Sequence, residues 1–151
     1  MPNVIHNIEL LNPEVKELLD AAQKVSFKAY NKYSKFYVGA AVRTISGNMY
    51  LGTYLDNASS GLTICAEPAA IMAANTNSDF RIESIAIVGG PMDRKSNNPI
   101  TPCGRCRQII FEASLVSSRN IAIYCSDLNF SNILITNIEE LLPLAFMRDD
   151  L

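Results

Sequence analysis

The sequence predicts a three-layer α/β fold, in which helices cover both faces of a mixed, mostly five-stranded sheet. Two observations predict it: helical and strand patterns alternate along the chain, and only one early pair of strands is joined by a tight turn. The chain has 151 residues, of which 48% are hydrophobic and 19% charged, and no linker or repeat interrupts it. This length suits one full core, so residues 1–151 are expected to form a single domain.

The first third of the chain predicts a helix followed by a β-hairpin. Asn12 is a good N-cap and Pro13 a good first helical residue, and apolar residues then recur at helical spacing as far as residue 29. Residues 37–44 and 49–54 have the character of strands, and the Ser-Gly-Asn turn between them tolerates positive φ. We expect these two strands to pair.

The middle of the chain predicts a helix that begins close to Cys65. Residues 64–75 are rich in alanine, and Pro68 fits among them only in the first turn, where its missing N–H has no helical partner. The remaining strands are expected over residues 81–88, 120–125 and 133–136, and the remaining helices over residues 103–113 and 136–142. The last helix would begin with the capping-box spacing of Thr136 and Glu139.

Composition and charge narrow the compartment and the classes of partner. Residues 1–11 lack the basic region and apolar run of a secretory signal, and no apolar stretch approaches the roughly 20 residues of a membrane span. A soluble, cytoplasmic protein with no membrane partner is therefore expected. The net charge of -2 disfavours a nucleic acid polymer as partner, because proteins that grip phosphate backbones usually carry a basic surface.

Four cysteines in a reducing compartment favour metal or catalytic chemistry over disulfides. Three of them lie in two segments, Cys65-Ala66-Glu67 and Pro102-Cys103-Gly104-Arg105-Cys106, each at the expected beginning of a helix. A helix N-terminus lowers the pKa of a thiol and so favours the thiolate that a metal needs. Cys65, Cys103 and Cys106 are predicted to hold one zinc per chain, with the fourth position open for water as in catalytic sites.

Glu67 is the predicted proton carrier of this site. Zinc lowers the pKa of a bound water to near neutrality. Hydrolysis of an amine on a ring also needs one proton moved to the ring and another moved to the leaving nitrogen. A carboxylate two residues from a zinc ligand could carry both protons. The simpler alternative for Glu67 is a first-turn acid that only complements the helix dipole.

The spacing Cys103-x-x-Cys106 alone has two other interpretations, a redox pair and half of a structural zinc site. The structural site needs a fourth ligand. Cys125 is the spare thiol, but it continues the face of an apolar strand and is predicted to be a small buried hydrophobe. The single histidine, His6, lies in a segment expected to be frayed, which disfavours it as a ligand.

Several segments match the motifs of one enzyme family. A ligand, one residue and a Glu, with Pro-Cys-x-x-Cys downstream, is a signature of zinc deaminases. Family motifs are also similar to residues 33–41, residues 56–58, residues 102–108 and residues 141–146. Together these segments resemble cytidine deaminases of the small homotetrameric class over nearly the whole chain.

The resemblance implies hydrolytic deamination at C4 of a free cytosine nucleoside, cytidine or deoxycytidine, by a homotetramer. It also implies that Phe36 stacks on the pyrimidine, that the Ala66 backbone contacts the ring, and that Phe146 reaches a neighbouring subunit's site. Tyr54 and Asp56 occupy the positions of the family's ribose-binding pair. Plain core packing is the alternative for the two phenylalanines.

Several positions depart from the family pattern. Pro68 stands where an arginine usually offsets the charge of three thiolates, and Arg105, between two predicted ligands, is the candidate for charge compensation in its place. Tyr54 and Asp56 replace an Asn and a Glu, and Ser60 stands where a Tyr is common.

These departures leave two alternatives for the function. The second zinc box, residues 102–108, is similar to that of blasticidin S deaminases, which also lack the arginine, so a modified cytosine nucleoside is the alternative substrate. An alternative of another class is a catalytically silent, zinc-folded scaffold that binds a nucleoside or a protein. The intact Glu67 argues against it.

Overall fold

The computed structural model describes residues 3–148 and contains a mixed sheet of six strands in the order β1-β6-β5-β4-β2-β3. Neighbouring strands are antiparallel except β4 and β5, which run parallel. The strands are β1 (Asn3–Ile5), β2 (Phe36–Thr44), β3 (Met49–Thr53), β4 (Ile82–Pro91), β5 (Ala122–Asp127) and β6 (Ile133–Asn137). The helices are α1 (Pro13–Ser26), α2 (Ala66–Thr76), α3 (Gly104–Ser117) and α4 (Ile138–Leu141), with short 3-10 turns at Ile8–Leu10 and Ser60–Leu62.

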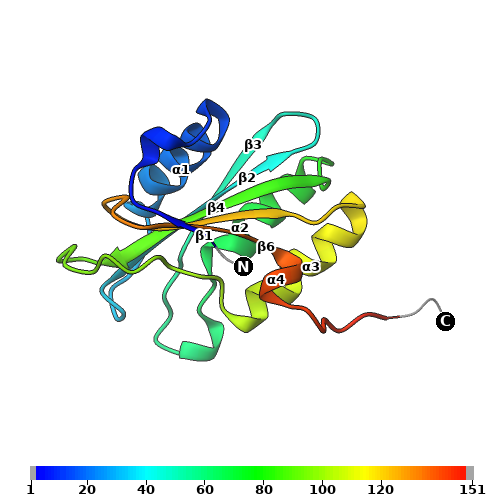
Figure 1. Ribbon diagram of the computed structural model, residues 1–151. Helices are drawn as coiled ribbons and strands as arrows, with labels where there is room; N and C mark the ends of the chain where they lie inside the picture. Colours follow the sequence, from blue (N-terminus) through cyan, green and yellow to red (C-terminus); the bar gives the residue numbers. More distant parts are fainter. Residues whose placement is uncertain (1–2, 149–151) are drawn as a thin grey trace.

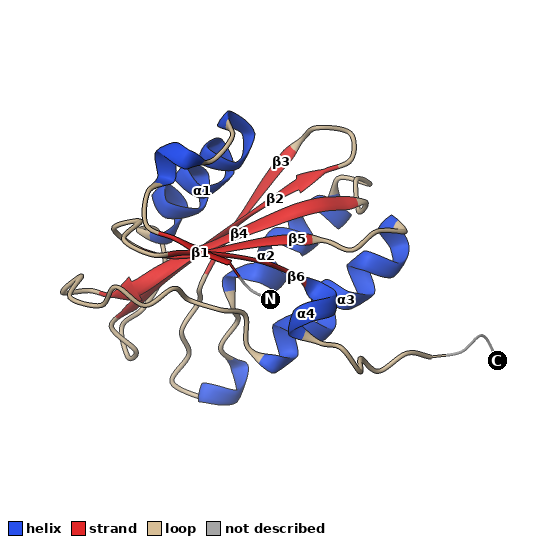
Figure 2. Cartoon of the chain, viewed as in Figure 1, coloured by secondary structure: helices blue, strands red, loops and turns tan. Residues whose placement is uncertain are grey.

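The helices lie on both faces of the sheet, as Figures 1 and 2 show, and this confirms the predicted three-layer α/β fold. Helix α1 packs on one face through its apolar stripe, including Leu18 and Leu19. Helices α2, α3 and α4 pack on the other face. The site segments predicted at the beginnings of α2 and α3 therefore share one layer.

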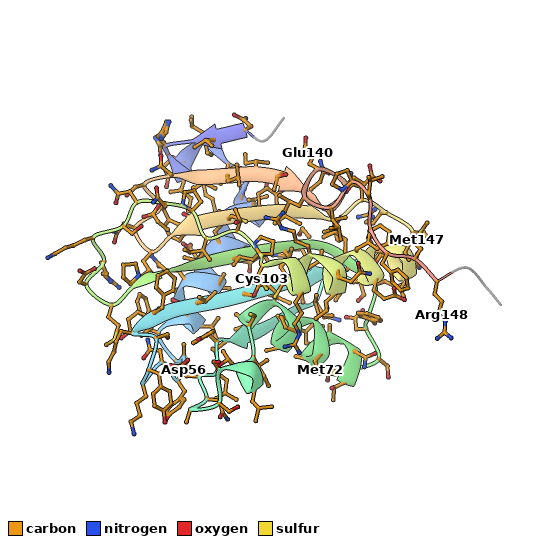
Figure 3. The ribbon with its side chains drawn as sticks, turned by 90° about the horizontal axis from the view of Figure 1, so that it is seen from below. Asp56, Met72, Cys103, Glu140, Met147 and Arg148 are labelled. Atoms are coloured by element: carbon orange, nitrogen blue, oxygen red, sulfur yellow. The ribbon has the colours of Figure 1, made fainter. Side chains whose placement is uncertain are left out.

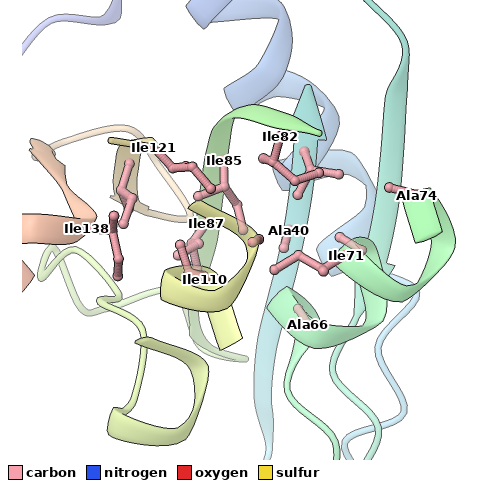
Figure 4. Close-up of a cluster of buried hydrophobic side chains, with 14 of the residues drawn as sticks. Ala40, Ala66, Ile71, Ala74, Ile82, Ile85, Ile87, Ile110, Ile121 and Ile138 are labelled. Carbon is pink, nitrogen blue, oxygen red and sulfur yellow. The ribbon is translucent and has the colours of Figure 1, made fainter. Parts of the chain in front are cut away.

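The core under α2 and α3 fixes these two helices relative to the sheet. Ile85 and Ile87 of β4 contribute to one buried cluster with Ile71 of α2 and Ile110 of α3 (Figure 4). Side chains that are fully buried in a close-packed interior resist displacement, because any shift opens a void or makes a clash. The first turns of the two helices are thus held in a fixed relation.

Gly52 lets α2 approach the sheet more closely than a side chain would allow. A Cβ at this position of β3 would lie 2.3 Å from the Ala66 carbonyl oxygen and 2.3 Å from the Ala70 nitrogen. Such distances are far inside van der Waals contact, so only glycine fits there. The first turn of α2 consequently rests directly on the β3 backbone.

The predicted count of five strands was one too low, because β1 was not expected. Its residues pair antiparallel with β6, Val4 opposite Leu134, at the edge of the sheet. The expectation of a frayed segment at His6 was also wrong, since its Nδ1 lies 2.6 Å from the Asn132 Oδ1. Three largely exposed residues give no alternating apolar pattern, so the pairing is visible only in three dimensions.

The last helix begins one residue later than predicted. Asn137 is its N-cap and accepts a hydrogen bond from the Glu140 N–H at 3.0 Å, whereas the Thr136 hydroxyl donates to the Glu140 carboxylate at 2.7 Å. Strand β6 continues through Thr136, opposite Ile123, to its last residue Asn137, opposite Ala122, so the helix can begin only after Asn137. Pairing in the sheet thus decided which of two capable N-caps is used.

Strand β4 also runs further than predicted, through Gly89 and Gly90 to Pro91, because the beginning of β2 pairs with it from Phe36 onward. Among residues 3–148, no helix has the length and apolar character that crossing a membrane requires.

Candidate active site

Three cysteines meet where helices α2 and α3 begin. Cys65 is the N-cap of α2, Cys103 is the N-cap of α3, and Cys106 lies in the first turn of α3. Their Sγ atoms all lie within 4.8 Å of one another, and those of Cys103 and Cys106 are 3.4 Å apart. We call these three residues the thiol cluster; Figure 3 shows Cys103 at the beginning of α3.

The thiol cluster suits zinc. With Zn–S bonds of about 2.3 Å, tetrahedral geometry separates two sulfurs by roughly 3.8 Å, close to the spacing observed. Within residues 3–148 it is the one set of three or more His, Cys, Asp or Glu side chains found close enough to hold a metal ion. Three protein ligands leave a fourth position open, as catalytic zinc sites do.

The electrostatics of the thiol cluster favour a bound cation. Hydrogen bonds from the Cys106 and Cys103 thiols, helped by the charge of Arg105 and opposed by burial, lower the pKa of Cys65 to about 6. The hydrogen bond to Cys65, burial and the Glu67 charge raise the pKa of Cys106. One thiolate therefore forms readily and then opposes the next, so three thiolates together need a positive charge among them.

Glu67 lies in the first turn of α2, two residues after Cys65, and only 4% of it is exposed. Burial raises its pKa to about 7, and the charge of Cys65 adds to this, against hydrogen bonds from its own backbone and from Cys106. A carboxyl group whose pKa lies near neutrality can both accept and release a proton under physiological conditions.

The remaining two candidates for metal ligands lie elsewhere. Cys125 is fully buried on β5, where burial raises its pKa to about 12 and the Glu67 charge adds to this. His6 is exposed and contacts Asn132. Neither joins the thiol cluster.

The residues predicted to contact a substrate lie on four separate segments. Phe36 is the first residue of β2 and is half-buried, and Ala66 is the fully buried first residue of α2. Tyr54 donates its hydroxyl to Asp56 at 2.7 Å, between β3 and α2. Phe146 is 75% exposed, so it does not pack into the core of its own chain. Contacts between these residues and a substrate stay a prediction.

Arg107 and Gln108, which follow Cys106 in α3, were not singled out from the sequence. Arg107 donates to the Pro102 carbonyl at 2.9 Å and to the Leu141 carbonyl at 3.1 Å, and Gln108 donates to the Phe146 carbonyl at 2.9 Å. They tie the end of α4 and the segment after it to α3. Their position inside the second zinc box was the available signal, but their partners are distant in sequence.

A groove on the molecule lies away from this chemistry. It measures about 540 Å³ and runs between α1 and β3, on the face opposite the thiol cluster. Its side chains carry mixed charges, among them Lys16, Glu17 and Asp20. Because no thiol lines this groove, the thiol cluster at the beginnings of α2 and α3 is the candidate active site.

Known proteins share both the fold and these segments. Residues 13–122 match the family described as the cytidine and deoxycytidylate deaminase zinc-binding region. A cytidine deaminase of Sporosarcina psychrophila is 33% identical over 138 residues, covering 91% of this chain and 95% of that protein. A blasticidin-S deaminase of Bacillus cereus is 32% identical over 139 residues, covering 88% of this chain and 92% of that protein. A crystal structure of cytidine deaminase from Burkholderia pseudomallei has a TM-score of 0.77 at 33% identity and covers 90% of this chain and 100% of its own.

The fold, the thiol cluster and these relatives define a zinc-dependent hydrolase of the aminohydrolase class. More narrowly, the chain belongs to the cytidine and deoxycytidylate deaminase family. The predicted family and the predicted zinc cofactor are confirmed.

Proposed function

We propose that this protein removes the amino group from C4 of a free cytosine nucleoside, cytidine or deoxycytidine, to give the uracil nucleoside and ammonia. The observation that carries the proposal is the thiol cluster, with sulfurs within 4.8 Å of one another, beside a buried Glu67 two residues from Cys65. This combination supplies three metal ligands and one proton carrier in one place.

The roles of the residues follow from their chemistry. Zinc, when held by Cys65, Cys103 and Cys106, supplies the Lewis acidity that makes water a nucleophile near neutral pH. Glu67 takes a proton from the attacking water, passes it to the ring nitrogen, and moves a second proton to the departing amine. The C4–N bond breaks, a C4–O bond forms, and the carboxylate returns to its initial state.

The substrate contacts complete the proposal. Phe36 stacks on the pyrimidine, the Ala66 backbone contacts the ring, and Tyr54 and Asp56 belong to the segment beside the sugar. Arg105 offsets part of the charge of the thiol cluster; its lowering effect on the pKa of Cys65 supports this role. The location of Ala66 in the first turn of α2, next to Cys65, supports the ring contact.

The test is ammonia release by protein carrying one zinc per chain, with cytidine, deoxycytidine and adenosine as substrates. Turnover of a cytosine nucleoside is expected. Turnover of adenosine alone would contradict the cytosine assignment, and no turnover of any amino-nucleoside would favour the silent scaffold.

A modified cytosine nucleoside is the second candidate substrate. Pro68 is the third residue of α2, and its side chain supplies no positive charge to the thiol cluster. A blasticidin-S deaminase is also among the relatives. Including blasticidin S in the same panel tests it, since a larger kcat/KM on blasticidin S than on cytidine would make it the preferred substrate.

Assembly, domain organisation and compartment are part of the same proposal. A homotetramer in which Phe146 enters a neighbouring site is supported by the exposure of apolar residues in the tail after α4, including Leu144 and Met147. A single domain over residues 1–151 is supported by one continuous sheet. Four free cysteines support a reducing, cytoplasmic location. Sedimentation at equilibrium would measure the predicted fourfold mass.

A further inference from the structure

We propose that Asp56 is a positioning residue, which holds the segment over residues 30–36 beside the active site and does not itself bond a sugar hydroxyl of the substrate. This inference rests on the proposed function, because it concerns how that site receives a nucleoside. It is carried by the hydrogen bonds of the Asp56 carboxylate, by its burial, and by the segments that it joins.

The Asp56 carboxylate already has three donors. Its Oδ2 accepts the backbone N–H groups of Tyr33 and Ser34, each at 2.8 Å, and its Oδ1 accepts the Tyr54 hydroxyl at 2.7 Å. A carboxylate oxygen has two lone-pair sites, so both sites of Oδ2 are filled and one of the two on Oδ1. With Asp56 only 6% exposed, little of the carboxylate remains for a substrate.

These bonds suit a structural anion. Burial raises the pKa of Asp56, but the hydrogen bonds from Ser34, Tyr54 and Tyr33 together lower it below its ordinary value. Hydrogen bonds to an ionised acceptor are shorter and stronger than neutral ones, and a buried donor left without its partner is costly. The carboxylate is therefore held as an anion for the two N–H groups of the segment.

Asp56 also joins two segments, one that leads to Phe36, the residue proposed to stack on the substrate, and one that leads to the thiol cluster. Its own N–H donates to the Tyr30 carbonyl at 2.8 Å, on the side of residues 30–36. On the other side, Leu55 and Ile64 exchange backbone hydrogen bonds of 2.9 and 3.0 Å, and Cys65 of the thiol cluster follows Ile64 directly. Asp56 thus joins the segment that leads to Phe36 with the segment that leads to the first cysteine.

The segment held by Asp56 needs such support. Lys35 has a φ of 55°, in the left-handed region that non-glycine residues rarely adopt, and it directly precedes Phe36. The Lys35 carbonyl accepts from the Met92 N–H at 3.0 Å, and the Phe36 carbonyl accepts from the Asn31 side chain at 3.1 Å. Asp56 secures the turn that comes before these contacts, and so sets the direction from which Phe36 enters the site.

The consequence for substrates is a weak dependence on sugar hydroxyls. A site built to bond a hydroxyl rejects an analogue without it, because its own polar groups are then left unpaired. Here the Asp56 carboxylate and the Tyr54 hydroxyl are paired with each other before any substrate arrives. Cytosine nucleosides that lack a 2′- or 3′-hydroxyl should be accepted with kcat/KM within about tenfold of cytidine.

The experiment crosses variants with substrates. Wild type, Asp56→Asn and Asp79→Asn are compared on cytidine, 2′-deoxycytidine and 2′,3′-dideoxycytidine, with zinc content measured for each. Positioning predicts that Asp56→Asn lowers kcat/KM by the same factor, about 10- to 100-fold, on all three nucleosides, chiefly through KM, with zinc retained. The control Asp79→Asn alters a carboxylate at the far end of α2 and should leave kcat/KM unchanged on all three.

A direct sugar bond predicts a different pattern. The factor by which Asp56→Asn lowers kcat/KM would then be large on cytidine and near one on dideoxycytidine. This result would overturn the proposal. Combining the substitution with Phe36→Ala adds a second readout. If Asp56 acts through Phe36, its effect should largely vanish in the Phe36→Ala background, whereas an undiminished effect there would also overturn the proposal.

Folding of the variant does not decide the outcome. If Asp56→Asn does not fold, Tyr54→Phe removes a single donor to the same carboxylate and carries the same two expectations. Absence of turnover on all three nucleosides by zinc-loaded wild type would overturn the proposed function and this inference together. Turnover with a hydroxyl-dependent factor would overturn this inference alone.

Discussion

Helix α2 has an acid near each end, and the two acids lie in opposite environments. Glu67 is in the first turn, where burial raises its pKa to about 7. Asp79 lies three residues beyond Thr76, the last residue of the helix, and its pKa is lowered to about 2. A group with a pKa near neutrality can exchange protons, whereas a group with a pKa of about 2 stays charged. One end of the helix is thus suited to chemistry and the other to stability.

Burial of Glu67 and hydrogen bonds to Asp79 account for the difference between their pKa values. The Asp79 carboxylate accepts from Ser46 at 2.6 Å, Asn48 at 2.9 Å, Thr44 at 2.8 Å and Tyr50 at 3.2 Å. These four donors come from the β2–β3 hairpin, so Asp79 pins that hairpin to the end of α2. Glu67 faces thiols at the other end, which are weak donors and become negative when they ionise. The same functional group therefore holds the hairpin in one place and is proposed to carry protons in the other.

Removing a thiol at the beginning of α2 should have the largest effect. Cys65→Ala should lose most of the bound zinc and all measurable turnover, because two remaining thiolates cannot make a site with three protein ligands. Metal analysis per chain and ammonia release measure this. The matched control is Cys125→Ala, which removes a buried thiol outside the thiol cluster and should keep its zinc. Equal zinc loss in both variants would indicate a closed structural zinc site, and the beginning of α2 would then not be a catalytic end.

Glu67→Gln should have the next largest effect. The amide keeps the shape and most hydrogen bonding but cannot shuttle protons, so kcat should fall by at least the roughly 10²- to 10⁴-fold typical of general acid–base groups. Zinc content and melting temperature should stay at wild-type values. Near-normal turnover would show that the acid at this end of α2 is not the proton carrier.

Arg105→Ala should have a smaller effect, on the pH profile. The charge of Arg105 favours the ionised form of the thiol cluster, so its loss makes deprotonation at the site harder. The acidic limb of kcat/KM should move upward by a few tenths of a pH unit, as for an exposed charge in high dielectric. Arg105→Lys retains the charge and should restore the wild-type limb. A pH profile that is the same in all three proteins would show that Arg105 does not contribute to the electrostatics of the site.

Asp79→Asn should have the smallest effect on activity and an effect on stability that depends on pH. Because the folded-state pKa of Asp79 is lowered, its contribution is fully present above the unfolded pKa of about 4 and is lost as pH falls through about 2. The variant should melt on the order of a few degrees below wild type at pH 7, and the difference should shrink toward pH 2. Unchanged kcat/KM would complete the contrast with Glu67→Gln, whereas a large loss of turnover would contradict the division between the two ends.

The beginnings of α2 and α3 could be predicted because their signals are local. Pro68 restricts where α2 begins, and the Cys-x-x-Cys spacing lies within one helical turn. The contacts of Asp56 were not predictable in this way, since its partner Tyr33 is 23 residues distant in sequence. The same holds for Arg107, whose partner Leu141 is 34 residues further along. Contacts of this kind depend on how strands and helices meet, which no short pattern records.

The edge of the sheet illustrates a similar limit. Strand β1 is held by backbone pairing with β6, and its side chains form no recognisable sequence pattern. The helix cap at Asn137 in place of Thr136 follows from the extent of β6, and so from its pairing with β5. In both places local propensity allowed more than one outcome, and tertiary pairing selected between them.

The close approach at Gly52 has a consequence for how sequence variation in this protein would be interpreted. In a saturation screen scored by deaminase activity, positions that reject every substitution are commonly assigned to chemistry. Gly52 has no functional group, yet any side chain there would push on the turn of α2 that carries Ala66 and Glu67. Its mutational profile would resemble that of Cys65, so a residue on the neighbouring strand would be counted among the catalytic positions for purely steric reasons.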